Sequence, residues 1–366
     1  MESKSSTYVI ILAAGYATRL RPLSEKIPKP LIDICGKTLI SRIISNFKEA
    51  GFTKFCIVLG YKDDMIKYEI SKHKDIDLLF VNQGAPKGMA DAIALGINSI
   101  LRETKHVVNF FITAADVIFP RQELLRMDTL HQYSDIVLSL MKSNDLEITK
   151  GHANVNLIED IDLINDIDEN QGLKIIDIIE KPKPSEIMSE YYSLPLYLTN
   201  NKILKYLKKI EISKRGEKEF QDILRIALQN GEDIRGLRIV PQLITRENIG
   251  EFHLTSLRDI IIMNKKYLTK SKVKKSKFIE PLRLGSDVRI GDKSKLGPYL
   301  IIGNSSKIGD FSELSNTILF DKVSIGKYCI LKWCIIDEGV SLPDKYYARN
   351  SFITQDNKNQ LEIINF

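Results

Sequence analysis

The sequence predicts an α/β protein in which a mixed, mostly parallel sheet carries helices on both faces, followed by a short parallel β-helix. Two observations predict this arrangement. Residues 8–116 alternate short apolar runs with amphipathic segments, which is the pattern of βαβ units and of a Rossmann-like sheet. From residue 284 onward, aliphatic residues recur every six positions, which is the pattern of a β-helix.

The predicted elements of the first part follow one another in order. The apolar run 8–12 predicts a buried parallel strand. Residues 38–50 have the apolar pattern of a helix, and Gly51 indicates where this predicted helix ends. The remaining predicted elements are strands over 54–59, 76–81, 106–113 and 174–179 and a helix over 88–101. Because ligands of parallel sheets bind at the carboxyl ends of the strands, the loop after the first strand is a candidate binding site.

The length of 366 residues indicates more than one domain. We expect a first domain over 1–245 and a helical connection with a basic linker over 246–278. The β-helix is predicted over 279–345, and 346–366 are predicted to form an irregular tail. An acidic stretch over 157–170 is interpreted as a solvated hairpin rather than a metal site.

The composition is that of an ordinary soluble protein, with 43% hydrophobic and 27% charged residues and a net charge of +6. The basic run 270–277 lacks interleaved aromatic residues, so we expect no nucleic-acid partner. No apolar run approaches ~20 residues, so no membrane partner is expected. The start of the sequence lacks the apolar core of a signal peptide. The four cysteines lack metal-like spacing, which favours reduced thiols and a cytoplasmic location.

The loop after the first strand has the composition of a polyphosphate site. Its first residues are mostly small, which lets backbone N–H groups come close to a phosphate; they are Leu12, Ala13, Ala14 and Gly15. The cations Arg19 and Lys29 follow, and Lys29 lies between two prolines that stiffen its backbone. The alternative is an ordinary turn with surface cations. A P-loop and a dinucleotide fingerprint are both excluded, because the glycines that they require are missing.

Residues 12–31 resemble the signature of the sugar-1-phosphate nucleotidylyltransferases, with Ala17 where that family usually has glycine. The resemblance implies that Arg19 binds the leaving pyrophosphate and that Lys29 binds the triphosphate. It also implies a catalytic Mg²⁺ held by Asp116, which follows the fourth strand, and a second metal ligand at His253. Histidine is a poor ligand for Mg²⁺, so the alternative is that His253 only hydrogen-bonds nearby.

Further motifs extend the resemblance. Gln83 and Gly88 have the family's spacing for reading a pyrimidine base, and the alternative is a polar loop before a helix. Glu180-Lys181-Pro182 matches the motif that binds the sugar phosphate. Gly151 and Ser193 lie where the family contacts the sugar, although Ser193 and Pro195 replace the usual residues. Asp222 is expected to be structural.

The six-residue repeat has a regular first part. Its apolar positions are Leu284, Ile290, Leu296, Ile302, Ile308, Leu314 and Phe320, and a glycine follows each of the first five. The repeat resembles the left-handed β-helix appended to many enzymes of this family, which implies a homo-oligomer formed through it. β-Helix acyltransferases need a catalytic histidine, and no histidine follows His253.

The resemblance implies nucleotidyl transfer from UTP or dTTP to glucose 1-phosphate or N-acetylglucosamine 1-phosphate, releasing pyrophosphate. Two alternatives stay open. One is mannose-1-phosphate guanylyl transfer, against which Gln83 argues. The other is a non-catalytic scaffold similar to subunits of the translation-initiation exchange factor. The departures from the family's usual residues at Pro195 and His253, and at Ala115 where the family has glycine, favour it.

Overall fold

The computed structural model describes residues 6–84, 87–104, 108–158, 172–207, 209–213, 216–239, 243–268, 278–356 and 358–366. These residues form two compact units. The first unit comprises residues up to 17, 27–32 and 38–253; the second comprises 18–26, 33–37 and 254–366. The main boundary lies after residue 253 rather than after the predicted residue 245, and two short segments near the start of the chain also belong to the second unit.

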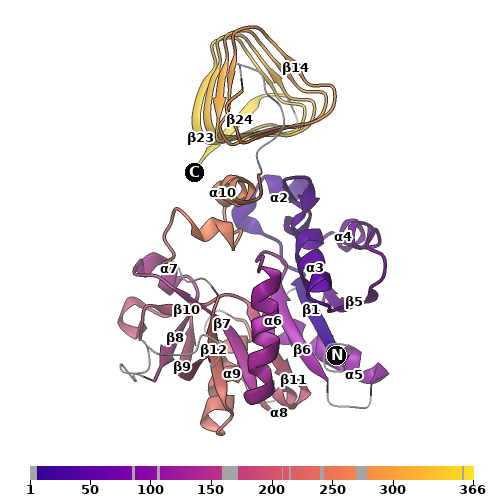
Figure 1. The fold of residues 1–366 in the computed structure, drawn as a ribbon, viewed down its shortest axis with the longest axis vertical. Helices are drawn as coiled ribbons and strands as arrows, with labels where there is room; N and C mark the ends of the chain where they lie inside the picture. Colours follow the sequence, from indigo (N-terminus) through magenta and orange to yellow (C-terminus); the bar gives the residue numbers. More distant parts are fainter. Residues whose placement is uncertain are drawn as a thin grey trace. The chain divides into compact units, whose positions relative to one another are not determined.

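The first unit is built on a ten-stranded mixed sheet with the order β10-β8-β9-β12-β7-β11-β6-β1-β4-β5 (Figure 1). Strands β1, β4, β5 and β6 are parallel neighbours, whereas β8 to β11 pair antiparallel with their neighbours. The strands are β1 Thr7–Ala13, β4 Lys54–Leu59, β5 Asp77–Asn82, β6 Asn109–Ala114, β7 Ile136–Lys142, β8 Ala153–Leu157, β9 Leu173–Glu180, β10 Tyr191–Ser193, β11 Leu196–Asn200 and β12 Ile234–Arg238. The predicted strands over 8–12, 54–59, 76–81 and 174–179 are confirmed.

Helices cover both faces of this sheet, as predicted. On one face, the rings of Phe47, Phe52 and Phe111 lie edge to face at centroid distances of 5.0–6.2 Å. On the other face, Ile10 and Phe110 belong to a core with residues of α5 and α9. The helices of this unit are α3 Leu39–Glu49, α4 Asp63–Ile70, α5 Met89–Glu103, α6 Arg121–Leu130, α7 Leu146–Lys150, α8 Leu204–Leu207 and α9 Phe220–Gln229, with the 3-10 helices η2 Lys29–Leu31, η3 His131–Tyr133, η4 Pro184–Glu186, η5 Asn201–Ile203 and η6 Ile249–Glu251.

The second unit is a parallel β-helix, whose triangular coils are seen end-on in Figure 1. Equivalent strands of successive coils pair in parallel, so that Leu300 pairs with both Leu282 and Thr317. Its strands are β13 Leu282–Leu284, β14 Arg289–Ile290, β15 Lys295–Leu296, β16 Leu300–Ile302, β17 Lys307–Ile308, β18 Glu313–Ser315, β19 Thr317–Leu319, β20 Ser324–Ile325, β21 Ile330–Ile336, β22 Ser341–Leu342, β23 Tyr347–Gln355 and β24 Leu361–Asn365. The unit also contains η1 Thr18–Leu20, α2 Leu23–Lys26, β2 Asp33–Ile34 and α10 Leu257–Tyr267; strand β3 spans Lys37–Thr38.

Two details of the predicted β-helix are wrong. Phe320 does not continue the row of buried aliphatic residues; Leu319 pairs with Ile302 and is buried instead. The prediction failed because the repeat slips by one residue before this position. The described residues of 346–366 do not form the predicted irregular tail. Strand β23 pairs in parallel with β21 as a further layer of the β-helix, and β24 pairs antiparallel with β23.

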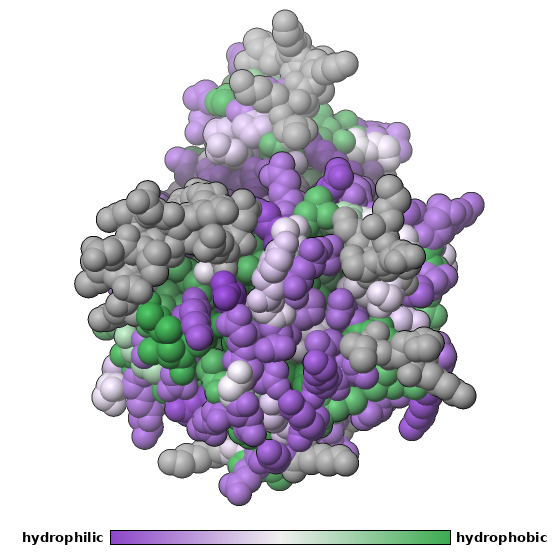
Figure 2. Space-filling view, turned by 60° about the horizontal axis from the view of Figure 1, so that its bottom comes forward, coloured by the Kyte–Doolittle hydropathy of each residue, from purple (hydrophilic) through white to green (hydrophobic). Residues whose placement is uncertain are grey.

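Other predictions lie partly outside the described residues. Most of the predicted acidic hairpin, 159–171, and the basic linker, 270–277, lie there, as does the start of the predicted strand over 106–113. All four cysteines are thiols and not disulfides. None of the described helices has the length and apolarity required to cross a membrane. The face drawn in Figure 2 is largely hydrophilic, and its hydrophobic side chains form separate small areas.

Candidate active site

The carboxyl ends of β1 and β6 bring two predicted residues together. The backbone N–H of Ala115 donates to the carbonyl of Leu12 at 3.0 Å, which places Asp116 beside the end of β1. The ammonium of Lys29, on η2, lies 2.5 Å from Oδ2 of Asp116, and both side chains are largely buried. Burial alone would raise the pKa of Asp116, but Lys29 and then His253 outweigh burial and hold this pKa well below its usual range.

His253 also contacts Oδ2 of Asp116. The segment that follows β6 runs beside residues 252–253, with the N–H of Ile118 donating to the carbonyl of Phe252 at 2.9 Å. Nε2 of His253 is 3.4 Å from Oδ2 of Asp116, and its Nδ1 is 3.2 Å from Nε2 of His152. Burial, and then His253, lower the pKa of His152 to about 3, so His152 is neutral at pH 7.

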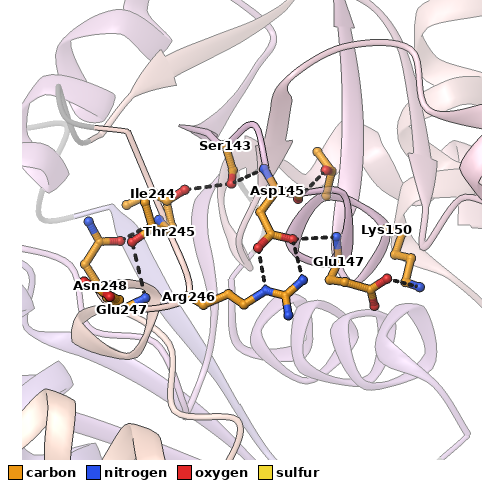
Figure 3. Close-up of polar contacts among 10 residues, drawn as sticks. Ser143, Asp145, Glu147, Lys150, Ile244, Thr245, Arg246, Glu247 and Asn248 are labelled. Atoms are coloured by element: carbon orange, nitrogen blue, oxygen red, sulfur yellow. Dashed lines mark hydrogen bonds and ion pairs between the residues drawn. The ribbon is translucent and has the colours of Figure 1, made fainter.

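The two segments that carry these histidines are joined by polar contacts (Figure 3). Asp145 caps α7 by accepting from the N–H of Glu147 at 2.9 Å, and it also forms a two-point ion pair with Arg246. The hydroxyl of Ser143 donates to the carbonyl of Ile244 at 2.7 Å. Because α7 leads to His152 and residues 244–252 lead to His253, these contacts hold the two histidine-bearing segments side by side.

Lys181 belongs to the same neighbourhood. Its backbone N–H donates to the carbonyl of His152 at 3.1 Å, and its charge contributes to lowering the pKa of His152. Its ammonium lies 3.7 Å from Oε1 of Glu180, and the Lys181 side chain is exposed. Gly151, the residue before His152, ends α7. The predicted residues Gly151, Glu180 and Lys181 therefore lie close to His152.

Gln83 follows β5, and its side chain contacts Gly88, the residue before α5. Gly88 has a φ of 103°, and an added Cβ would lie 2.8 Å from the backbone of Lys218, so this position requires glycine. The amide nitrogen of Gln83 donates to the carbonyl of Gly88 at 3.3 Å and to Asp91 at 3.1 Å. Reading a base with both groups of this amide requires one of these hydrogen bonds to be released.

The loop after β1 has the predicted small residues but differs in detail. Ala13 and Ala14 are buried, whereas Gly15 is exposed and an added Cβ would meet nothing within 4 Å. Ala17 has a φ of 50°, in the left-handed region that favours glycine. This backbone conformation is a physical reason for glycine at the equivalent position of the resembling family.

Arg19 and Ser193 are not brought to the Asp116 cluster by the described contacts. Arg19 is an exposed residue of η1, which belongs to the second unit, so its role stays a prediction. Ser193 is buried on β10, and its hydroxyl donates to the carbonyl of Leu194 at 3.1 Å. This internal hydrogen bond gives Ser193 a structural role in the chain as it stands.

The residues around Asp116 fit a divalent cation in one respect. Oδ1 of Asp116 is buried and has no hydrogen-bond partner among the described residues, and a carboxylate oxygen is a ligand that such cations prefer. Within the same part of the chain, no group of three or more histidine, cysteine or acidic side chains could hold a metal. The protein therefore supplies few ligands here, and a bound cation would depend on oxygen atoms of substrate and water for the others.

Comparisons with known proteins identify the family to which the chain belongs. Residues 8–237 match the family model described as nucleotidyl transferase, and residues 298–350 match the model described as GlmU-like, C-terminal hexapeptide. The chain is 29% identical over 352 residues to the "Bifunctional protein GlmU" of Methanococcus maripaludis strain S2, covering 94% of this chain and 76% of that protein. For strain C5 of that species, the match to a protein of the same name covers 47% of the relative.

Other similar proteins carry the names of different enzymes. The chain is 32% identical over 127 residues to mannose-1-phosphate guanyltransferase beta-B of Xenopus laevis, covering 33% of this chain and 34% of that protein. The crystal structure of a UDP-glucose pyrophosphorylase with UDP-glucose has a similar fold, with a TM-score of 0.59 and 20% identity, covering 71% of this chain and 98% of that chain. Because residues 8–237 match the family model, the chain belongs to the nucleotidyl transferase family, and its second unit carries GlmU-like hexapeptide repeats.

Proposed function

We propose that the protein transfers a nucleotidyl group from UTP or dTTP to a sugar 1-phosphate, with glucose 1-phosphate and N-acetylglucosamine 1-phosphate as the first candidates. A phosphate oxygen of the sugar attacks the α-phosphorus of the nucleotide in line, and pyrophosphate leaves. The attacking oxygen is already anionic at neutral pH, so no general base is required and catalysis consists of positioning and charge neutralisation.

One observation supports this proposal most strongly. Lys29 and Asp116 meet at the carboxyl ends of β1 and β6, and Lys181 lies next to His152, which contacts His253 beside Asp116. A phosphate-binding cation from the opening loop and one from the sugar motif are thus connected through a short chain of contacts. Such an arrangement suits a substrate pair in which both partners carry phosphate.

Each residue has a role that follows from its chemistry. The ammonium of Lys29 neutralises the triphosphate near the reacting phosphorus, and that of Lys181 binds the phosphate of the sugar. Arg19 binds the leaving pyrophosphate. A divalent cation, when bound, supplies positive charge to the triphosphate oxygens, and Asp116 would hold it. The hexapeptide repeats of the second unit join copies of the chain into a homo-oligomer.

The test is a pyrophosphate-release assay with a panel of nucleotides and sugar 1-phosphates, with Asp116→Asn as the inactive control. Release with UTP or dTTP and a gluco-configured sugar phosphate is expected. Release only with GTP and mannose 1-phosphate would replace the proposed substrates, as the similarity to the Xenopus guanyltransferase allows. If no pair of substrates releases pyrophosphate, the proposed enzymatic activity is refuted and a scaffold role is favoured.

A further inference from the structure

One coil of the β-helix buries an acidic side chain at a position where an earlier coil has glycine. The N–H of Gly303 donates to the carbonyl of Leu319 in the next coil at 2.8 Å. The N–H of Asp337 donates in the same way to the carbonyl of Ile353 at 2.9 Å, so Asp337 and Gly303 occupy equivalent positions. The Asp337 side chain is only 4% exposed. Because a buried carboxylate is destabilising unless it is paired and hydrogen-bonded, its partners indicate what it does.

The partners of Asp337 come from two distant parts of the chain. Its Oδ2 accepts from the hydroxyl of Thr354, in the next coil, at 2.6 Å and from the ammonium of Lys26 at 2.5 Å. Its Oδ1 accepts from the N–H of Glu338 at 2.9 Å. The ammonium of Lys26 also donates to the hydroxyl of Thr354 at 3.0 Å. Lys26, which lies 311 positions before Asp337 in the sequence, thus supplies positive charge to this buried carboxylate.

Lys26 ends a short segment of the opening loop that belongs to the second unit. This segment, 18–26, comprises η1 and α2 and contains Arg19. Leu20 and Leu23 are each only 1% exposed, so the segment is held by packing as well as by the contact of Lys26. Arg19 itself is exposed, which leaves its side chain accessible to an anion. The anchored lysine and the predicted pyrophosphate ligand therefore share one packed segment.

The second unit also holds a later part of the opening region, 33–37. The N–H of Cys35 donates to Oδ1 of Asn264 on α10 at 2.8 Å. The ammonium of Lys265, the next residue of α10, lies 4.5 Å from the ring centre of Trp333 on β21. Helix α10 thus connects 33–37 to the β-helix, and the second unit fixes two segments of the opening region.

We propose that Asp337 and Lys26 are positioning residues for Arg19: the β-helix holds 18–26 so that Arg19 is already ordered when pyrophosphate is bound. The inference rests on the role proposed above for Arg19 and adds how that residue is held. An arginine on an ordered segment binds pyrophosphate more tightly than one on a mobile segment, because the entropy cost of ordering the segment is met during folding. The β-helix then contributes to catalysis in addition to its proposed role in oligomerisation.

The kinetic test uses the reverse reaction of the full chain. In this direction an oxygen of inorganic pyrophosphate attacks the α-phosphorus of the nucleotide sugar, and the sugar 1-phosphate leaves. Lys26→Met should raise the KM for pyrophosphate on the order of ten- to a hundredfold, with the KM for the nucleotide sugar nearly unchanged. The double variant Lys26→Met with Asp337→Asn leaves no buried charge unpaired and should have the same effect. Lys322→Met, which removes a lysine that pairs with Glu338 of the β-helix, is the matched control and should change neither KM.

Combined variants test whether Lys26 acts through Arg19. In Arg19→Ala the guanidinium is absent, so adding Lys26→Met should raise the KM for pyrophosphate less than about twofold further. A further rise as large as that in the unmodified background would show that Lys26 acts independently of Arg19, and would overturn the proposal. An unchanged KM for pyrophosphate in the double variant of Lys26 and Asp337 would overturn it as well.

A second measurement needs no turnover. Hydrogen exchange in 18–26 of the full chain should be faster in Lys26→Met and in the double variant with Asp337→Asn, and unchanged in Lys322→Met. Unaltered exchange in 18–26 would refute the anchoring of this segment by the β-helix. If no substrate pair gives activity, the proposed function fails, and the exchange experiment still decides whether the β-helix anchors the segment that carries Arg19.

Discussion

The structure predicts how much the ion pair between Lys29 and Asp116 contributes to the free energy of unfolding. Lys29→Met removes the ammonium but keeps a side chain of similar length, and Asp116→Asn removes the negative charge. The atoms lie 2.5 Å apart, and the two side chains are only 16% and 22% exposed. Either single change leaves a largely buried ionic group without its partner, so each should destabilise the first unit.

The size of the coupling follows from Coulomb's law. At an effective dielectric constant of about 20, two unit charges at this separation attract by about 7 kcal/mol. The loss of hydration on burial offsets most of this attraction, which leaves a coupling free energy of about 1–3 kcal/mol. The coupling should be full above about pH 5. It should shrink as the pH falls below about 4, because the unfolded aspartate then takes up a proton that the folded one, with its lowered pKa, does not.

The assay is a double-mutant cycle of Lys29→Met and Asp116→Asn, measured by urea unfolding at pH 7 and pH 3.5 and followed by a signal from the first unit. A coupling near 2 kcal/mol at pH 7 that declines at pH 3.5 is expected. A coupling below about 0.5 kcal/mol at pH 7 would show that the pair does not contribute to stability, and the argument from burial would be wrong.

Three further predictions concern other parts of the chain. Gly309→Ala should destabilise the β-helix by about 1–3 kcal/mol in a thermal scan, because its Cβ would lie 2.5 Å from the backbone of Gly326 in the next coil; an unchanged melting temperature would contradict this packing. Burial lowers the pKa of His131 to about 4, so between pH 6.5 and 4 the unfolded chain binds a proton that the folded chain does not, and stability should fall by up to about 1.4 kcal/mol per pH unit as the pH drops. His131→Gln should flatten that decline. If its free energy of unfolding had the same pH dependence as that of the unmodified protein, the buried His131 would not be the cause. Arg246→Gln should change the free energy of unfolding by less than about 1 kcal/mol but speed hydrogen exchange in 145–152, and unaltered exchange there would argue against the joining role of this ion pair.

The parts of the fold that follow local rules could be predicted from the sequence. Apolar runs gave the strands at 8–12 and 54–59 within a residue or two, since a parallel strand buried on both faces is apolar throughout. Asp116 could be placed because the ends of parallel strands share one edge of the sheet. The helix α4, Asp63–Ile70, was not predicted, because only Ile66 and Ile70 of its residues are fully buried and its apolar pattern is weak.

The rest depends on contacts between distant residues. No role was predicted for His152. It contacts His253, which lies 101 positions further along the chain, and no local sequence pattern reveals such a contact. Gly151, the residue before His152, was predicted to contact the sugar instead. The shift from Phe320 to Leu319 comes from one coil that is a residue shorter than the coil before it, which the spacing of apolar residues did not locate. Strand β23 forms because β21 offers an edge to pair with, and β24 in turn pairs with β23; the alternation of apolar residues in both strands is short.

The measurement that tests the central claim most directly is the KM for the sugar 1-phosphate in Lys181→Ala, with Lys183→Ala as a control at a nearby exposed lysine. We expect this KM to rise at least about tenfold in Lys181→Ala, with the KM for the nucleotide nearly unchanged, because a charge-assisted contact to phosphate is lost. Lys183→Ala should match the unmodified protein. An unchanged KM for the sugar phosphate in Lys181→Ala would contradict the assignment of this lysine and, with it, the shared site around Asp116.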